Sequence, residues 1–79
     1  MVNDWKNFVK TSLSIRNNKV CIRGTRVMVS VILDCLAEGI CEEDILSEYP
    51  SLKKTDVRVA LSYAAILARN ETLIINNRE

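Results

Sequence analysis

Residues 20–29 are the stretch that most constrains how this chain can fold. They read Val-Cys-Ile-Arg-Gly-Thr-Arg-Val-Met-Val, two short β-prone segments, 20–23 and 26–29, on either side of a Gly-Thr break. Valine and isoleucine are stiff at χ1 and suit a pleated strand. Gly24 can adopt the positive φ that a tight reversal needs. The chain is polar and irregular before this stretch and helical in its apolar spacing after it. We therefore expect a partly extended N-terminal arm joined here to a helical body.

A further β-prone segment comes before this stretch. Leu13 and Ile15 alternate with polar residues, which is the period of a half-buried strand. Asparagines occupy positions 17 and 18, and asparagine tolerates the left-handed backbone of a tight turn. The pattern predicts a hairpin in which residues 13–16 pair with residues 20–23.

Three helices are predicted after the hairpin. The first follows Ser30, whose hydroxyl suits an N-cap, and stops at Gly39, which favours a left-handed C-terminal cap. The second covers residues 42–49 and ends before a proline, with acidic residues in its first turn where the helix dipole favours them. The third has Thr55 as its cap and runs over residues 56–69. The predicted fold is mainly α: a short N-terminal β-hairpin arm followed by a three-helix helix-turn-helix body.

The third predicted helix is apolar on two faces. One face holds small and aliphatic residues, Val57, Leu61, Ala64, Ala65 and Ala68. The other face holds Val59, Tyr63 and Ile66. A chain of 79 residues buries only a thin core, so we predict a homodimer with this second face as the seam. The same face also fits the rest of the core.

The chain is predicted to form one domain. Residues 1–29 form the arm and hairpin, residues 30–70 the helical body, and residues 71–79 a tail whose apolar residues are expected to pack as an edge strand or against a second subunit. Basic residues dominate residues 1–28, and every charged residue in 29–51 is acidic. This separation indicates an oriented binding surface, although ordinary solvated faces also carry such charges.

Several function classes are disfavoured by the composition. The chain has no histidine, the commonest general base and metal ligand. Cys21, Cys35 and Cys41 match no zinc-binding spacing. No stretch reads as a signal peptide or as a membrane span. We expect a cytoplasmic protein with reduced cysteines, no metal, no cofactor and no enzymatic activity.

The order of the predicted helices is that of a helix-turn-helix domain, whose last helix enters the major groove of DNA. Lys53, Lys54 and Arg58 lie at the start of that helix, where groove and phosphate contacts are usual. The preceding helix is acidic and would be repelled by phosphates. DNA contact and a purely protein-binding role both remain open at this point.

Several short motifs together resemble a known family. In chain order they are residues 19–27 (Lys-Val-Cys-Ile-Arg-Gly-Thr-Arg-Val), 37–39 (Ala-Glu-Gly), 42–46 (Glu-Glu-Asp-Ile-Leu), 49–50 (Tyr-Pro) and 63–65 (Tyr-Ala-Ala). This order and spacing resemble the domain of unknown function 433 family, regarded as VapB-type antitoxin-like proteins with a homeodomain-like helix-turn-helix fold. Members are often paired with a PIN-like toxin ribonuclease. The chain departs from the family where relatives have Asp-Pro, Gly-Gly and Pro, at residues 12–13, 17–18 and 20.

The resemblance implies an antitoxin-like protein that neutralises a PIN-like nuclease and binds DNA through its third helix to regulate its own expression. In that mechanism a basic arm fills a nuclease site built of carboxylates. The partner-binding residues predicted are Arg16, Arg23, Arg26, Trp5 and Phe8. The alternative is a protein-interaction module without DNA binding, whose acidic face is the working surface.

The Gly24-Thr25-Arg26 run allows two interpretations. In one, Arg26 contacts a partner or a phosphate. In the other, which we favour, Gly24 makes a turn, Thr25 hydrogen-bonds locally, and Arg26 ties the hairpin to an acidic residue such as Asp34 or Asp56.

Overall fold

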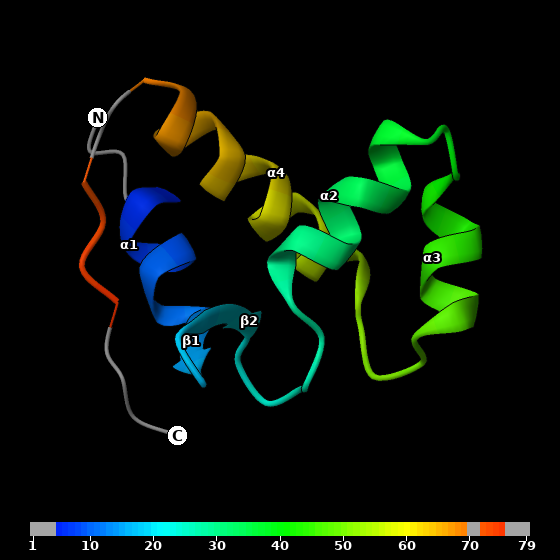
Figure 1. Cartoon of the computed structure of the whole chain (residues 1–79), viewed down its shortest axis with the longest axis horizontal. Helices are drawn as coiled ribbons and strands as arrows, with labels where there is room; N and C mark the ends of the chain where they lie inside the picture. Colours follow the sequence, from blue (N-terminus) through cyan, green and yellow to red (C-terminus); the bar gives the residue numbers. More distant parts are fainter. Residues whose placement is uncertain (1–4, 70–71, 76–79) are drawn as a thin grey trace.

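The computed structural model describes residues 5–69 and 72–75. In this part of the chain four helices accompany one two-stranded antiparallel hairpin, so the fold is mainly helical as predicted (Figure 1). The elements are α1 (Trp5–Thr11), β1 (Leu13–Arg16), β2 (Lys19–Ile22), α2 (Val29–Ala37), α3 (Glu42–Glu48) and α4 (Lys54–Ala68). The hairpin and α1 lie at one end of the molecule and α3 at the other (Figure 1).

Helix α1 was not expected, because the polar sequence before residue 12 shows no clear helical period. Isolated helices shorter than about 12 residues are marginal in water, so packing must stabilise this one. Val9 is buried, and α1 packs against α4 and β1. Its last turn is closed by the Ser12 hydroxyl, which donates to the Phe8 carbonyl at 2.7 Å. The arm is therefore a docked helix and not an irregular segment.

The predicted hairpin is confirmed, with its second strand displaced by one residue. Leu13 pairs with Ile22, and Arg16 pairs with Lys19. Asn17 and Asn18 have φ values of 50° and 64°, as a two-residue type I′ turn requires. Because the turn contains only these two residues, the second strand begins at Lys19. The predicted extended segment 26–29 contributes only an isolated bridge between Cys21 and Met28.

Helix α2 starts earlier and ends as predicted. Its N-cap is Met28, so Ser30 lies inside the first turn and is not the cap we expected. Gly39 has a φ of +87°. The Gly39 N–H donates to the Leu36 carbonyl and the Ile40 N–H donates to the Cys35 carbonyl, both at 3.0 Å. This is the Schellman arrangement that a left-handed glycine permits.

Helices α3 and α4 occupy the predicted segments, and α4 has a different cap from the one predicted. Cys41 is the N-cap of α3, and Ile45 is its buried residue. Lys53 is the N-cap of α4, so the expected Thr55 cap is wrong. The Lys53 N–H donates to the Asp56 Oδ2 at 2.9 Å, which satisfies one of the free donors at the helix start. The same bond gives the buried Asp56 carboxylate a hydrogen-bond donor.

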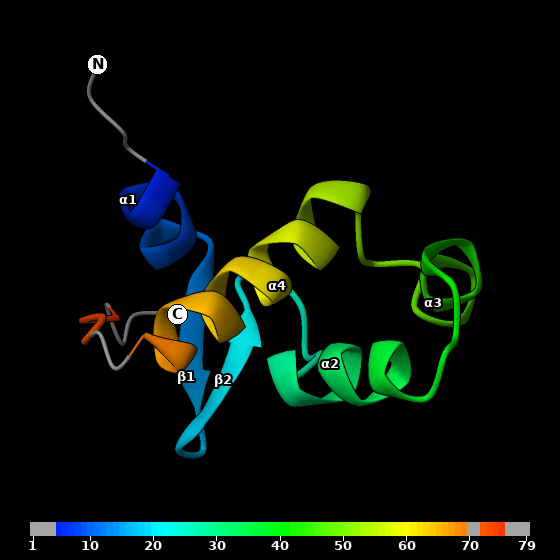
Figure 2. The same ribbon diagram turned by 90° about the horizontal axis from the view of Figure 1, so that it is seen from above.

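Helix α4 packs against α1, α2 and α3 (Figures 1 and 2). Val59 and Ile66 are each only 1% exposed in a single copy, and Tyr63 is half-buried. Val59 and Ile66 already belong to the core of a single copy. They are therefore not available to the dimer seam that we predicted. Leu61, placed by prediction on the packing face, is 49% exposed.

The tail packs without forming a strand in its described part. Leu73 and Ile75 pack against the core, and Ile74 is exposed. Residues 71 and 76–79 of the predicted tail lie outside the described residues. Among the residues the structure covers, no helix has the length and apolar character to cross a membrane.

Candidate binding surfaces

The loop from residue 22 to residue 27, here called the Arg26 loop, is tied to itself by hydrogen bonds. The Thr25 N–H and hydroxyl both donate to the Ile22 carbonyl, at 3.0 and 2.9 Å. The Val27 N–H donates to the Thr25 hydroxyl at 3.0 Å, and the Ile22 N–H donates to the Val27 carbonyl at 3.0 Å. Gly24 has a φ of +84°, which suits the third position of a type II turn. The expected roles of Gly24 and Thr25 are confirmed.

Arg23 is the residue that ties this loop to the rest of the hairpin. Its Nε donates to the Thr11 carbonyl at 2.9 Å, and its Nη2 donates to the Leu13 carbonyl at 2.8 Å. Its backbone N–H donates to the Ser12 carbonyl at 2.9 Å. The guanidinium thus joins the end of α1, the start of β1 and the Arg26 loop. Arg23 has a structural position, unlike the partner-facing one that the sequence suggested.

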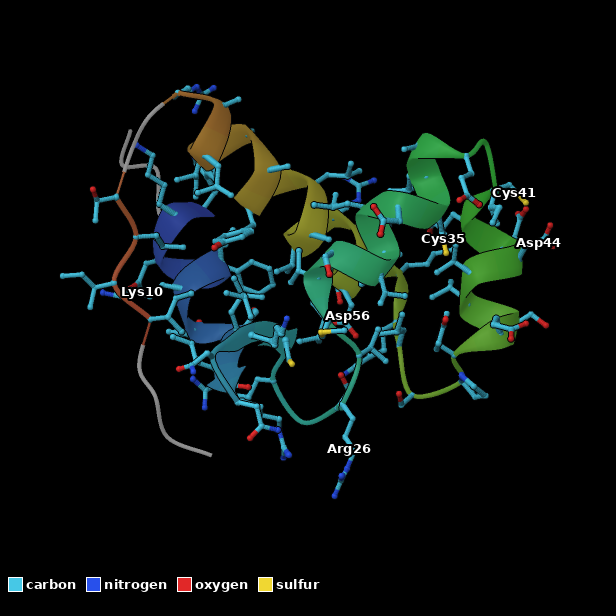
Figure 3. The ribbon with its side chains drawn as sticks, viewed as in Figure 1. Lys10, Arg26, Cys35, Cys41, Asp44 and Asp56 are labelled. Atoms are coloured by element: carbon cyan, nitrogen blue, oxygen red, sulfur yellow. The ribbon has the colours of Figure 1, made fainter. Side chains whose placement is uncertain are left out.

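Arg26 behaves in the opposite way. Its side chain is exposed and points away from the body (Figure 3). Within residues 5–69 and 72–75 it makes no hydrogen bond or ion pair, and the Asp56 carboxylate instead accepts from the Lys53 N–H. The tie we expected from Arg26 to Asp34 or Asp56 is therefore absent. A loop braced by four hydrogen bonds presents this one cation to solvent.

Two hollows meet at Arg26. The first, here called the cationic hollow, is lined by Arg16, Asn17, Lys19, Cys21, Arg26 and Met28. The second, here called the apolar hollow, is lined by Gly24, Thr25, Arg26, Val27, Val31, Tyr49 and Ser51. The hairpin turn brings Arg16 and Lys19 together because these two residues form the last pair of the ladder. The sequence named Arg16 and Arg26 but did not indicate Lys19, whose place depends on the register.

The cationic hollow measures 290 Å³ and the apolar hollow 530 Å³. A third hollow, of 390 Å³, lies between the hairpin, α2 and α4 and is lined in part by Tyr63 and Leu67.

The start of α4 brings together the three cations that were predicted to contact DNA. Lys53, Lys54 and Arg58 are all exposed. Lys54 and Arg58 are four residues apart and therefore lie on the same side of the helix. Helices α2, α3 and α4 pack against one another behind this surface. The arrangement can offer positive charge to a phosphate backbone.

Helix α3 carries an acidic face at the opposite end of the molecule from the hairpin (Figure 1). Glu43, Asp44 and Glu48 are exposed, and the buried Ile45 faces the body. Figure 3 shows Asp44 directed outward at this end. No lysine or arginine occurs between residues 27 and 52, so this face has no basic neighbour along that stretch of chain. We call Glu43, Asp44 and Glu48 the acidic face.

The two aromatic residues of α1 differ in position. Trp5 packs against the core, and the Lys6 Nζ and the Arg69 Cζ each lie 5.7 Å from its ring centroid. Phe8 is 51% exposed. Of the two predicted partner-binding aromatics, Phe8 is thus the accessible one.

The cysteines are free thiols. Cys21 is buried, Cys35 is half-buried and Cys41 is exposed. The described part of the chain contains no cluster of His, Cys, Asp and Glu residues that could hold a metal ion.

The structure defines a small, mainly helical protein with one two-stranded antiparallel hairpin. Residues 9–64 match the family described as protein of unknown function (DUF433), and the chain belongs to that family. The match extends from α1 into α4, so it covers the Arg26 loop, the acidic face and the start of α4. This confirms the family resemblance. Searches of curated proteins and of solved structures found no significant match.

Proposed function

We propose that this chain is an antitoxin-like binding protein, which neutralises a PIN-like nuclease and binds DNA through the start of α4 to regulate its own expression. Membership of the family supports the proposal through the resemblance described above. The observation that carries the neutralising role is Arg26, an exposed arginine without a partner in the described chain, held out by a rigid loop.

The physical basis is the match between an arginine and a nuclease site built of carboxylates. A guanidinium can bind a carboxylate through two parallel hydrogen bonds. A loop that is already braced loses little conformational freedom on binding. Arg26 would enter the nuclease site, while Arg16 and Lys19 in the cationic hollow contact acidic groups around it. Arg23 would not take part, because its guanidinium holds the hairpin together.

The experiment is inhibition of the purified PIN-like nuclease by this protein. Arg26→Glu is expected to weaken inhibition by about tenfold or more, since it places a like charge against the carboxylates. Lys10→Glu on α1 is the matched control, because it makes the same change in charge outside the Arg26 loop. Equal inhibition by wild type and Arg26→Glu would contradict the neutralising mechanism.

The exposed cations at the start of α4 support the DNA-binding part of the proposal. Replacing Lys53, Lys54 and Arg58 together by alanine should weaken binding to the protein's own promoter. It should also reduce the slope of log K against log salt by about 2 to 3, if each side chain neutralises one phosphate. An unchanged slope would remove these residues from any DNA contact.

The second candidate function is a protein-interaction module without DNA binding. The acidic face favours it, because α3 would lie near the phosphates in a helix-turn-helix complex and would repel them. This candidate predicts no DNA binding by the wild type and loss of a protein partner after Glu43→Lys.

A further inference from the structure

Arg26 lies at the boundary between two hollows of different chemistry. The cationic hollow has three basic lining residues, and its remaining lining residues are uncharged: Asn17, Cys21 and Met28. The lining of the apolar hollow includes Val27, Val31 and Tyr49. Its volume of 530 Å³ lies within the range of pockets that bind small ligands. A ligand that fills both hollows must therefore carry negative charge beside an apolar group.

We propose that the two hollows form one site for an acidic segment of a partner protein, with carboxylates in the cationic hollow and an aliphatic side chain in the apolar hollow. The inference rests on the neutralising role proposed above for Arg26, and it adds the chemistry of the partner's segment. Residues 5–33 contain no acidic residue, so this stretch supplies no carboxylate of its own to the cations. The exposed Arg26 guanidinium has no partner within residues 5–69 and 72–75, and it can hold a carboxylate through two parallel hydrogen bonds.

The apolar hollow supplies the other half of the site. Val31 is half-buried on α2, while Val27 and Tyr49 are half-buried and pack against the core. An aliphatic side chain placed here removes apolar surface of both partners from water, which is favourable. Exposed ion pairs contribute little to affinity by themselves. We therefore expect the aliphatic side chain to supply much of the affinity and the cations to select an acidic segment.

Charge also sets the direction of the segment and disfavours nucleic acid. Glu48 immediately precedes Tyr49, so a residue of the acidic face adjoins the apolar hollow along the chain, and carboxylates are favoured on the hairpin side instead. Proteins that bind single-stranded nucleic acid stack bases on aromatic side chains. Among the described residues that line the two hollows, Tyr49 is the one aromatic, and it packs against the core.

The test is a nuclear magnetic resonance titration of the ¹⁵N-labelled 9.0 kDa protein with three capped peptides. The first is Gly-Asp-Asp-Leu-Asp-Gly, the second has serine in place of leucine, and the third has asparagine in place of each aspartate. The first peptide is expected to shift the amide signals of Arg26, Val31 and Ser51. It should bind about tenfold more tightly than the second, because one leucine is buried. The third peptide should bind most weakly, and the affinity of the first should fall at about 0.5 M salt.

A protein variant shows whether the leucine occupies the apolar hollow. Val31→Ser removes apolar surface from the lining and should reduce the difference between the first two peptides from about tenfold to about threefold. Leu61→Ser is the matched control, because Leu61 is 49% exposed on α4 and lines neither hollow. It should leave the tenfold difference unchanged. Circular dichroism confirms that both variants are folded.

Three results would overturn the inference: no shift with the first peptide at about 5 mM, equal affinities for the first two peptides, or an oligothymidylate that binds more tightly than the first peptide. The nuclease inhibition assay with Arg26→Glu is a separate readout of the neutralising role. Inhibition that depends on Arg26 while the first two peptides bind equally would keep that role and remove the aliphatic contact. Selective binding of the first peptide without any effect of Arg26 on inhibition would keep the site and exclude the nuclease as its partner.

Discussion

The hairpin end and the α3 end of this protein both bury apolar side chains in one core, but among the described residues the bonds from side chains to backbone carbonyls are found at the hairpin end. At the hairpin end, polar side chains bind backbone carbonyls: Arg23 joins Thr11 and Leu13, and Thr25 braces the Arg26 loop. At the α3 end, a buried isoleucine and the glycine cap after α2 hold a short acidic helix. Directional bonds fix the orientation of a loop, whereas apolar burial fixes only which face of a helix is covered. The comparison indicates that the hairpin end is built to present one side chain accurately.

The largest effect is expected at the α3 end, where Ile45 is buried. Ile45→Ala should reduce the free energy of unfolding by about 2 to 5 kcal/mol, because it leaves a cavity at a side chain that is 1% exposed. Denaturant unfolding measures this loss. A loss well below that range would show that α3 contributes little to the folded state, and the contrast between the two ends would fail.

The next effect separates the two arginines. Arg23→Met removes two hydrogen bonds to carbonyls and should cost about 1 to 3 kcal/mol of stability. Arg26→Met, its matched control three positions later in the loop, should change stability by less than about 0.5 kcal/mol. Similar losses in the two variants would mean that Arg26 has a structural contact as well.

The two glycines with positive φ provide a direct comparison between the ends. Gly24 and Gly39 have φ values of +84° and +87°, and a Cβ added at either position would meet no atom within 4 Å. Alanine at either site should therefore cost only the backbone strain of the left-handed region, about 1 to 2 kcal/mol. Nearly equal losses in thermal unfolding are expected. A much larger loss at one glycine would point to a rearrangement beyond that strain.

The smallest expected effect has the opposite sign. Ser14 is fully buried, and its hydroxyl has no hydrogen-bond partner among the residues that the structure describes. Ser14→Ala removes this unsatisfied group and should stabilise the hairpin end by up to about 1 kcal/mol. Destabilisation in the same unfolding assay would show that the hydroxyl is satisfied in solution.

Much of the fold could be predicted from local chemistry. The Asn17-Asn18 turn, the left-handed Gly24 and Gly39, and the segments of α2, α3 and α4 follow from backbone preference and apolar spacing. Helix α1 could not be predicted, because a seven-residue helix depends on packing for its stability, and α1 buries Val9 and packs against α4 and β1. The N-caps of α2 and α4 were also predicted at the wrong residues. Met28 and Lys53 begin these helices although neither has a side chain that caps well.

The candidate surfaces show the same division. The sequence by itself determined which residues are charged, where tight turns occur and which family the chain resembles, because these depend on residue type and short spacing. Only the tertiary structure decided that Arg23 is bound to carbonyls while Arg26 is exposed, and that Val59 and Ile66 belong to the monomer core. The reason is physical: burial and hydrogen-bond partners depend on segments far apart in the chain, and no local pattern records how those segments meet.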